Sequence, residues 1–528
     1  LLTAYKKVHI SKLNQISGRE ALAMCVEAKL TRHQYNIIRF FCKLRFPSYK
    51  KVQLAKKECY PEKECIKVTD TFAEIKLQSL LNHTATRLLE AQKDVLEVQK
   101  PENIKNMTLI CKWGMDGSTQ TEYKQKYSSS DTSGNDANLF ISSLVPIQLI
   151  SDNLLEKQSL VFWQNQRCSS TRYCRPIKFI FQHETSDLAK SEAQLVRKQI
   201  EELRPVTYSV NHVQVAVKCV MLFTMVDGKI CNAMTDTNST QRCFLCGLTS
   251  KNFNNLQKVC STDLIDTSRL EFGLSILHGW IRVFECLLHL SYKLPIKKWQ
   301  ARGDEDKLIV ANTKRTIQDK FKTEMDLHVD KPKPGFGNSN DGNTARRFFK
   351  NPEAAACITG IDIEIIQRFK IILQTISSGH EINVEKYRAY ALKTAELFVD
   401  KYNWYPMPPT VHKLLIHGPE IIKHALVPIG QLSEEAQEAR NKEFRKYREC
   451  YSRKISRVKT NEDILNLLLI SSDPVISGMR IVPKKNSATF EKEVIELLKP
   501  PEVQISTTIA RHTSSTSSDD GSNSSDTE

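Results

Sequence analysis

The sequence has no uninterrupted apolar stretch of the roughly 18 to 20 residues that a membrane-spanning helix needs, so we expect no membrane function. We expect no signal peptide, and the 15 cysteines are scattered along 528 residues, which argues against the disulfide framework of a small secreted domain. We therefore expect reduced thiols in a cytosolic or nuclear protein. The segment 506–528 has almost no bulky apolar residues and is rich in Ser, Thr and Asp, so it should be disordered.

Acidic residues are also in deficit, because 60 Asp and Glu face 76 Lys and Arg and give a formal net charge of +16. Since the last segment is acidic, the folded body is more basic than this total. A basic surface favours a nucleic-acid partner, although ribosomal, membrane-surface and chaperone-like proteins share this balance. The chain begins at Leu1 rather than at a methionine, so we expect a further N-terminal segment before it.

Hydrophobic periodicity and composition divide the chain into five expected parts: 1–98, 99–263, 264–430, 431–505 and 506–528. The first is a helical N-terminal module for dimerisation and DNA binding. The second is an α/β core, the third a long helical insertion and the fourth a further helical region. In the first part, the basic run at 50–57 suits either contact with phosphates or an ordinary solvated helix face.

The α/β core has four strand-like runs and one amphipathic helix. In chain order they are Met107–Met115, Leu139–Ile150, Pro176–Phe181, the helix Leu188–Leu203 and Val213–Val226, if a short run at 160–163 is discounted. This order is the opening half of a ribonuclease-H-like sheet, in which carboxylates lie at the end of the first strand and just after the fourth. Asp116 and Asp227 occupy these two places. Taken singly, each Asp-Gly pair is also typical of a turn.

A third carboxylate is expected from a helix that Ser433 can cap. Its apolar side is predicted to consist of Phe444, Tyr447, Tyr451 and Ile455. At about 100° per residue, Glu438 lies about 180° from Tyr447 and so points away from that side. The same outer face carries Glu435, Glu438, Lys442 and Arg445. Taken alone, the helix also fits an exposed charged helix with i,i+4 ion pairs.

Two pairs of metal-binding residue types stand far apart in the chain, Cys243 with Cys246 and His412 with His417. A Cys-x2-Cys turn presents two thiolates to one tetrahedral ion, and two histidines five residues apart at a helix end can supply the other ligands. We therefore predict a closed, structural zinc site that pins the helical insertion to the core. Buried cysteines and surface histidines are the alternative.

These residues resemble the Transib family of transposases and their relative, the catalytic subunit of the V(D)J recombination-activating recombinase. The resemblance covers about residues 100–480, with a looser likeness around Pro47-Ser-Tyr-Lys-Lys. It rests on the order Asp, Asp, Cys-x2-Cys, His-x4-His and Glu. The segments that carry it are Thr224–Lys229, Arg242–Thr249, His412–His417 followed by Gly-Pro-Glu-Ile-Ile, and Ser433–Arg448, with weaker matches at Asn343–Arg347 and Leu277-His278.

The resemblance implies a ribonuclease-H-like catalytic core in which Asp116, Asp227 and Glu438 hold two Mg2+ or Mn2+ ions, as converging carboxylates require. It implies one structural Zn2+ and no organic cofactor. It also implies DNA contacts by Arg346, Arg347, Arg440, Lys442, Arg445, Arg448 and the site-adjacent His278. One more residue separates His417 from Glu438 than in the recombinase, so Glu435 remains the alternative to Glu438.

The implied function is cut-and-paste transposition by a nuclear homodimer. The enzyme would nick double-stranded DNA beside terminal inverted repeats, form hairpins on the flanking DNA and join the freed 3′-hydroxyl ends to target DNA. Two other functions remain open. One is a domesticated DNA-binding regulator that no longer cleaves, which would tolerate loss of a carboxylate. The other is a zinc-stabilised scaffold for protein partners, in which Asp116 and Asp227 are turn residues.

Overall fold

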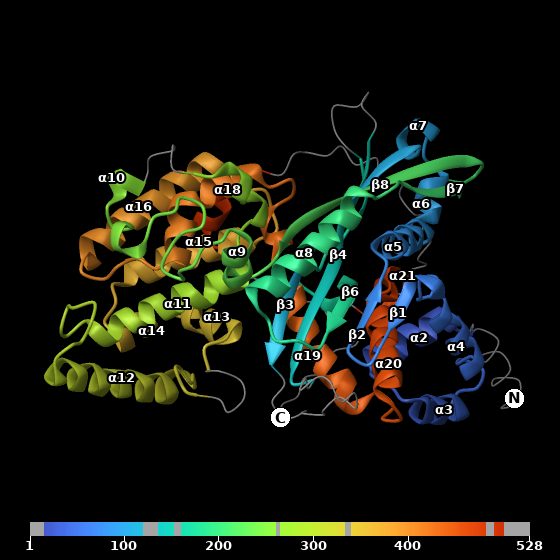
Figure 1. Ribbon diagram of the computed structural model, residues 1–528, viewed down its shortest axis with the longest axis horizontal. Helices are drawn as coiled ribbons and strands as arrows, with labels where there is room; N and C mark the ends of the chain where they lie inside the picture. The colour runs from blue at the N-terminus through green and yellow to red at the C-terminus, as the bar shows by residue number, and fades with distance from the viewer. Residues whose placement is uncertain are drawn as a thin grey trace, which may run out of the picture.

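A computed structural model of the chain describes residues 15–119, 136–152, 160–259, 265–332, 339–481 and 490–500. It shows a mixed α/β protein with an eight-stranded sheet between a helical lobe and a second group of helices (Figure 1). Within these residues, no helix is long and apolar enough to cross a membrane, and the cysteines are free thiols, as expected. The acidic segment 506–528 lies outside the described residues.

The strands are β1 (Ile66–Val68), β2 (Phe72–Ile75), β3 (Asn106–Thr119), β4 (Asn138–Ser151), β5 (Val161–Gln164), β6 (Arg175–Ile180), β7 (Val206–Val210) and β8 (Val213–Met225). They are ordered β1-β2-β6-β4-β3-β8-β7, and β5 pairs with β4. The long strand β3 is antiparallel to β4 and parallel to β8. The four strands predicted from the sequence are therefore confirmed as β3, β4, β6 and β8, and the short run discounted at 160–163 forms β5.

The N-terminal region is not wholly helical as predicted, because β1 and β2 extend the sheet beyond β6. Phe72 lies in β2, whereas the sequence predicts it in a helix. Residues 66–75 are too few for periodicity to separate strand from helix. The helices of this region are α2 (Gly18–Glu27), α3 (Arg32–Phe41), α4 (Tyr49–Lys57), α5 (Leu77–Ala91), α6 (Lys93–Glu97) and α7 (Pro101–Ile104).

The two faces of the sheet are covered by helices from different parts of the chain. Neighbouring residues of β6 point to opposite faces, as strand geometry requires. Lys178 forms an ion pair at 2.6 Å with Glu192 of α8 (Ser186–Glu201), and Phe179 packs edge-on against Phe444 of α19 (Glu435–Cys450). Figure 1 accordingly shows α8 in front of the sheet and α19 behind it. The sheet is therefore a central layer that holds α19 against β3.

The C-terminal helices α20 (Arg457–Ser471) and α21 (Pro474–Met479) return to the N-terminal helices. A buried ion pair between Arg87 of α5 and Asp473, at 2.9 Å, fixes this contact. Because both side chains are removed from water, loss of either partner would leave an uncompensated buried charge. The first and last parts of the chain thus form one packed group.

The described part of 265–430 is helical, as predicted. It forms the helical lobe at the left of Figure 1. Its main helices are α11 (Ile276–Lys293), α12 (Asp304–Met325), α13 (Gly342–Lys350), α14 (Pro352–Thr359), α15 (Ile363–Ser377), α16 (Val384–Tyr402), α17 (Pro409–His412) and α18 (Gly418–His424). The short α9 (Gly228–Met234) and α10 (Leu256–Val259) precede them, and α22 (Lys492–Leu497) packs on α15. The first long helix begins at Ile276, because the preceding short helix η5 (Thr267–Phe272) ends at Gly273, whose φ of 63° breaks the helical path.

Candidate functional site

The pairing of β3 with β8 brings Asp116 and Asp227 to the same edge of the sheet. The two strands run parallel, and their last paired residues are Gly114 and Met225. Each aspartate stands two residues beyond its strand's last pair, so both carboxylates reach the same level. Asp227 also caps α9, because its Oδ1 accepts a hydrogen bond from the Ile230 N–H at 2.8 Å. The turn role and a place in an acidic cluster therefore coexist in this residue.

The register of β3 and β8 shifts immediately before the two aspartates, and the shift skips Thr224. A bulge of this kind re-aims the residues that follow it and is frequent beside active sites. At Gly114 the two backbones approach so closely that a Cβ atom built there would lie 2.0 Å from the Met225 carbonyl oxygen. Glycine is therefore required at this position by the packing of the two strands.

Gly114→Ala is expected to destabilise the fold by at least about 3 kcal/mol, because a methyl group facing backbone atoms cannot be relieved by a rotamer change. Chemical denaturation of the purified variant measures this loss. Gly303→Ala is the matched control, since nothing lies within 4 Å of a Cβ atom at Gly303. Equal stability of the two variants would contradict the close strand contact.

Helix α19 is fixed beside Asp116 by a direct hydrogen bond. The Asn441 side-chain amide donates to Asp116 Oδ2 at 2.7 Å. Glu438 stands three residues earlier on α19, on nearly the same side of the helix. The helix packs against β3, β4 and β8. This contact brings the third predicted carboxylate to the edge where the two aspartates lie.

A buried lysine in the central strand fixes the start of α19. Lys112 is fully buried in β3, and its ammonium group donates hydrogen bonds to the carbonyl oxygens of Gln431 at 2.8 Å and Ser433 at 2.6 Å. Burial lowers the pKa of Lys112. Because its partners directly precede α19, this side chain sets where the helix begins relative to the sheet.

Helix α19 differs from the prediction at both ends. It begins at Glu435 with Glu434 as the cap residue, and Ser433 lies one position before the cap. The helix ends at Cys450, so Ile455 is not part of it and is 78% exposed. Tyr451 is exposed as well. The buried side consists of Ala436, Gln437, Arg440, Asn441, Phe444 and Arg448, while Glu435, Glu438, Lys442 and Arg445 retain solvent access.

Electrostatic repulsion marks the acidic cluster. Burial and the negative charges of Asp227, Glu184 and Glu438 raise the pKa of Asp116 well above its usual range, against the opposing effect of His278. Glu184, in the segment between β6 and α8, was not predicted as a member. Its carboxylate forms an ion pair with Lys229 at 3.1 Å. Four carboxylates thus interact at one edge of the sheet.

A buried glutamate links α19 to α11. Glu434 accepts hydrogen bonds from the Ile276 N–H at 3.0 Å, the His278 N–H at 3.1 Å and the His278 ring at 3.0 Å, and it also contacts the Ser275 hydroxyl. Burial alone would lower the pKa of His278, but Glu434, Asp227 and Asp116 raise it to about 9. His278 is therefore a cation at neutral pH beside the acidic cluster.

The predicted basic residues fall into two groups. The first group lies at or near the surface: Arg346 pairs with Glu435, Lys442 pairs with Glu438 at 2.9 Å, Arg347 donates to the Met325 carbonyl at 2.7 Å, and Arg445 donates to the Thr119 carbonyl at 3.3 Å. These four side chains are half-buried or exposed. Arg346, Lys442 and Arg445 lie on or against the outer face of α19, whereas Arg347 contacts the end of α12. Glu435 and Glu438 are thus bound to different cations.

The second group, Arg440 and Arg448, is buried and does not form the DNA-contacting surface that the sequence predicts. Arg440 is fully buried and donates hydrogen bonds to Ser471 at 3.1 Å and to the carbonyl oxygens of Thr171 and Cys174. Arg448 is 3% exposed and forms an ion pair with Asp136. Both guanidinium groups hold α19 to the rest of the protein, so they are not part of the DNA surface proposed below.

The four predicted zinc ligands come together in the structure. The ligand atoms of Cys243, Cys246, His412 and His417 all lie within 4.8 Å of one another. Among the described residues this is the only such group of three or more His, Cys, Asp or Glu side chains. The two cysteines lie on a tight turn in which the Gly247 N–H donates to the Cys243 carbonyl at 2.8 Å. A π-helical turn, η6 (Lys413–His417), brings the two histidines toward one side.

The environment of this cluster fits a bound cation. Both ring nitrogens of His417 and Nδ1 of His412 are buried without a hydrogen-bond partner, which is costly unless a ligand satisfies them. Hydrogen bonding from Cys246, with His412 and His417 beside it, lowers the pKa of Cys243 toward the thiolate that binds metal. His412 stacks on Phe253 at 3.9 Å, which fixes its ring. The group can therefore hold a metal such as zinc.

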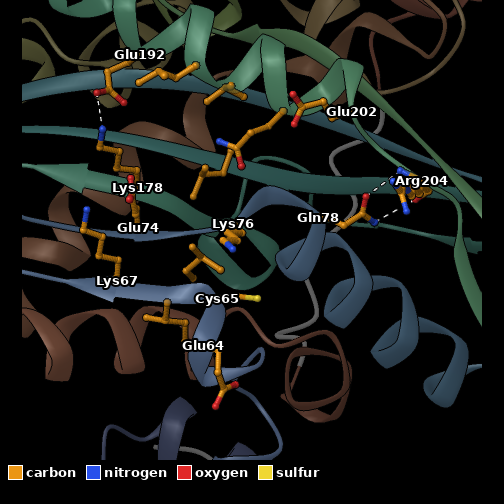
Figure 2. Close-up of a pocket in the computed structure, with 16 residues that line it drawn as sticks. Glu64, Cys65, Lys67, Glu74, Lys76, Gln78, Lys178, Glu192, Glu202 and Arg204 are labelled. Carbon is orange, nitrogen blue, oxygen red and sulfur yellow. Dashed lines mark hydrogen bonds and ion pairs between the residues drawn. The ribbon is translucent and has the colours of Figure 1, made fainter.

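A cavity of about 910 Å³ lies elsewhere, between α8 and the strands β1, β2 and β6 at one side of the sheet. Figure 2 shows that its charged residues are mixed in sign, with Lys67 and Lys178 close to Glu74 and Glu192. The Gln78 side-chain amide donates a hydrogen bond to the Arg204 carbonyl oxygen and accepts one from the Arg204 N–H. None of the predicted site residues lines this cavity. It is therefore separate from the acidic cluster and the metal cluster.

Four residues of this site escape prediction from the sequence: Lys112, Glu184, Glu434 and Asn441. A signal exists for two of them. Lys112 is the only charged residue of the mostly apolar run Met107–Met115, where a charge is unusual, and Glu184 is an acidic residue of the short segment between β6 and α8. Glu434 and Asn441 lie among many polar residues of α19, so only the fold distinguishes them.

Comparison with known proteins gives limited similarity. No protein-family model matches the chain, and no curated protein sequence matches it. One solved structure, the Drosophila P element transposase strand transfer complex, is similar over 87% of this chain and 92% of that chain, with 10% sequence identity and a TM-score of 0.30. A similarity at this TM-score does not establish a shared fold.

Proposed function

We propose that this protein is a DDE-type DNA transposase that cleaves and joins DNA by metal-dependent phosphoryl transfer. The acidic residues would be Asp116, Asp227 and Glu438. The observation that carries the proposal is the hydrogen bond from Asn441 to Asp116, because it places α19, and with it Glu438, at the strand edge shared by the two aspartates. The arrangement of β6, β4, β3 and parallel β8, with one carboxylate near the end of β3 and one just beyond β8, supports a ribonuclease-H-like core.

The carboxylates suit divalent cations with hard oxygen ligands, Mg2+ or Mn2+. Burial, together with the negative charges of Asp227, Glu184 and Glu438, raises the pKa of Asp116, and bound cations would offset these charges. Bound there, the two ions would supply activation of an attacking oxygen and stabilisation of a leaving one. His278, a cation held by Glu434, is placed to attract a DNA phosphate toward this edge.

The DNA surface of the proposal consists of exposed cations around the outer face of α19 and the N-terminal part of α13. They are Arg346, Arg347, Lys442 and Arg445. Contacts of this kind bind phosphates without reading sequence. The proposed activity follows the Transib and recombinase pattern: nicking at terminal inverted repeats, hairpin formation on flanking DNA and joining of 3′-hydroxyl ends, by a homodimer in the nucleus.

The test is incubation of the full chain with inverted-repeat DNA in Mn2+ or Mg2+, scored for nicks and hairpins. Glu438→Gln is expected to abolish nicking, whereas Glu435→Gln keeps it, since only Glu438 is among the charges that act on Asp116. Glu435→Gln is the matched control, because it is the same change three residues away on the same helix. The reverse result would transfer the metal-binding role to Glu435.

A second candidate function is a zinc-stabilised scaffold, and the metal cluster is the observation that favours it. A scaffold of this kind does not need Asp116, Asp227 and Glu438 to lie close together. A chain that binds zinc but neither nicks DNA nor retains it at physiological salt would support the scaffold. A chain that retains DNA at that salt without cleaving it would support a DNA-binding regulator instead.

A further inference from the structure

A groove of about 990 Å³ extends from the acidic cluster into the helical lobe. It begins beside Asp227 and His278 and is lined along its length by α11. The segment 236–244, which leads to the zinc cysteines, and the segment 405–413, which leads to the zinc histidines, complete its walls. The groove is therefore an extension of the site proposed above, built from the parts that the metal cluster holds together.

The length and volume of this groove suit unpaired nucleotides. His278, Arg282, Glu285 and His289 line it at spacings of four, three and four, so they share one face of α11. At about 1.5 Å per residue this face is about 16 Å long, which equals four or five nucleotides at about 3.4 Å each. Its volume of about 990 Å³ is that of a site for one small molecule, which suits a short part of a single strand better than a duplex.

The charge of the groove suits a phosphate backbone. Five Lys and Arg side chains line it, against four Asp and Glu side chains: the cations are Lys190, Lys229, Arg242, Arg282 and Lys413, and the anions are Asp187, Asp227, Asp236 and Glu285. Three of the cations are engaged by carboxylates, because Lys190 pairs with Asp236, Lys229 with Glu184 and Arg282 with Glu285. In the part of the chain that the structure describes, Arg242 and Lys413 make no ion pair. Lys413 lies 4.5 Å from the Phe244 ring centre, a cation–π contact that does not neutralise its charge, so both cations can attract an anionic ligand.

An aromatic side chain lies in the same groove. Trp299 is 37% exposed and packs edge-on against buried Tyr405, with ring centroids 5.0 Å apart. The Lys293 ammonium group lies 4.4 Å from the Trp299 ring centre. An indole fixed by its neighbours and partly open to solvent is a surface on which a nucleic-acid base can stack.

We infer that this groove binds a short unpaired stretch of a DNA strand next to the acidic cluster. The inference rests on the proposed function, since the duplex acted on there would supply the strand. Base stacking on Trp299 and phosphate contacts from Arg242 and Lys413 hold the strand without sequence preference. The active site thereby receives a strand that has left its duplex, whereas the exposed cations around α19 hold the duplex itself.

The test measures binding of the full chain to fluorescent oligothymidine of about 12 nucleotides and to a duplex of equal length, without added Mg2+ or Mn2+. Trp299→Ala and Arg242→Ala are each expected to weaken single-strand binding by roughly ten-fold, with less than about two-fold change for the duplex. Phe490→Ala, at 38% exposure, and Arg315→Ala, on the surface of α12, are the matched controls and should bind both probes like the parent.

The inference is overturned if the parent does not bind the single strand, if both groove variants bind it like the parent, or if they lose duplex and single strand equally. Thermal unfolding of each variant separates loss of binding from loss of fold, and Arg242→Ala keeps the test open if Trp299→Ala unfolds. The proposed function fails separately: a parent that binds the single strand through Trp299 but never nicks DNA in Mn2+ supports the groove and refutes the transposase.

Discussion

Asp116→Asn, Asp227→Asn and Glu438→Gln are each expected to reduce metal-dependent DNA cleavage by at least about a thousand-fold. In the proposed site, each change would replace an anionic oxygen ligand of a divalent cation by a neutral amide oxygen. Catalytic cations contribute several kcal/mol to stabilisation of the transition state, and each 1.36 kcal/mol is about ten-fold in rate. Single-turnover cleavage of inverted-repeat DNA in Mn2+ measures the effect.

Asp152→Asn is the matched control for these variants. Asp152 accepts a hydrogen bond from Thr108 at 2.8 Å, at the opposite end of β3 from Asp116. The chemical change is the same, but no acidic cluster is nearby, so the cleavage rate should equal that of the parent. If Asp116→Asn cleaves as fast as Asp152→Asn, Asp116 is not a metal ligand.

The pH dependence of the stability of Asp116→Asn tests the environment of Asp116 independently of DNA cleavage. Burial and neighbouring carboxylates raise the pKa of Asp116 in the folded state, so the folded state binds more protons than the unfolded state above pH of about 4. The parent therefore loses stability relative to the variant as pH rises from there. In metal-free buffer we expect the variant to be the more stable of the two at pH 7, and the two to converge below pH of about 4. Denaturation across this range measures it.

The sequence predicts the aspartates well because their positions depend on local patterns. Strand periodicity places Asp116 near the end of β3, which itself continues to Thr119 rather than ending at Met115, and Asp227 just beyond β8; the parallel pairing of these strands brings both residues to one edge. The metal ligands are equally predictable, because spacing within each pair identifies them although the pairs are 166 residues apart. In both cases few residue types can do the expected chemistry, so the sequence identifies the candidates and the fold shows only how close together they lie.

The environment of α19 could not be predicted in the same way. Periodicity shows which residues share a helix face, but it does not show what covers that face. Arg440 is therefore expected at the DNA surface, whereas Thr171, Cys174 and Ser471 from distant segments surround it. The same limit applies to Ile455, because nothing local shows that α19 ends at Cys450. Long-range contacts decide these positions.

Loss of the metal cluster is expected to have the largest effect on stability. Cys243→Ser removes a thiolate ligand, so the purified variant should contain less than one zinc ion for every ten chains, as a rough limit, while the parent contains about one per chain. The destabilisation should be at least about 3 kcal/mol for two reasons. The cluster joins the segment after α9 to the helices after α16, and loss of the metal would leave the buried His417 nitrogens without a partner. Metal analysis and thermal unfolding measure both effects.

Cys231→Ser is the matched control, because Cys231 is a buried free thiol on α9 that is not part of the cluster. This variant should keep its zinc and lose only the stability that a buried hydroxyl costs. Zinc-free parent protein, or a Cys243→Ser variant with full zinc, would refute the metal site. Because Asp227 caps α9 and the cysteine turn follows it, loss of zinc should also loosen the groove wall at 236–244. Single-strand binding should then fall in Cys243→Ser and not in Cys231→Ser, which connects the metal cluster to the DNA path.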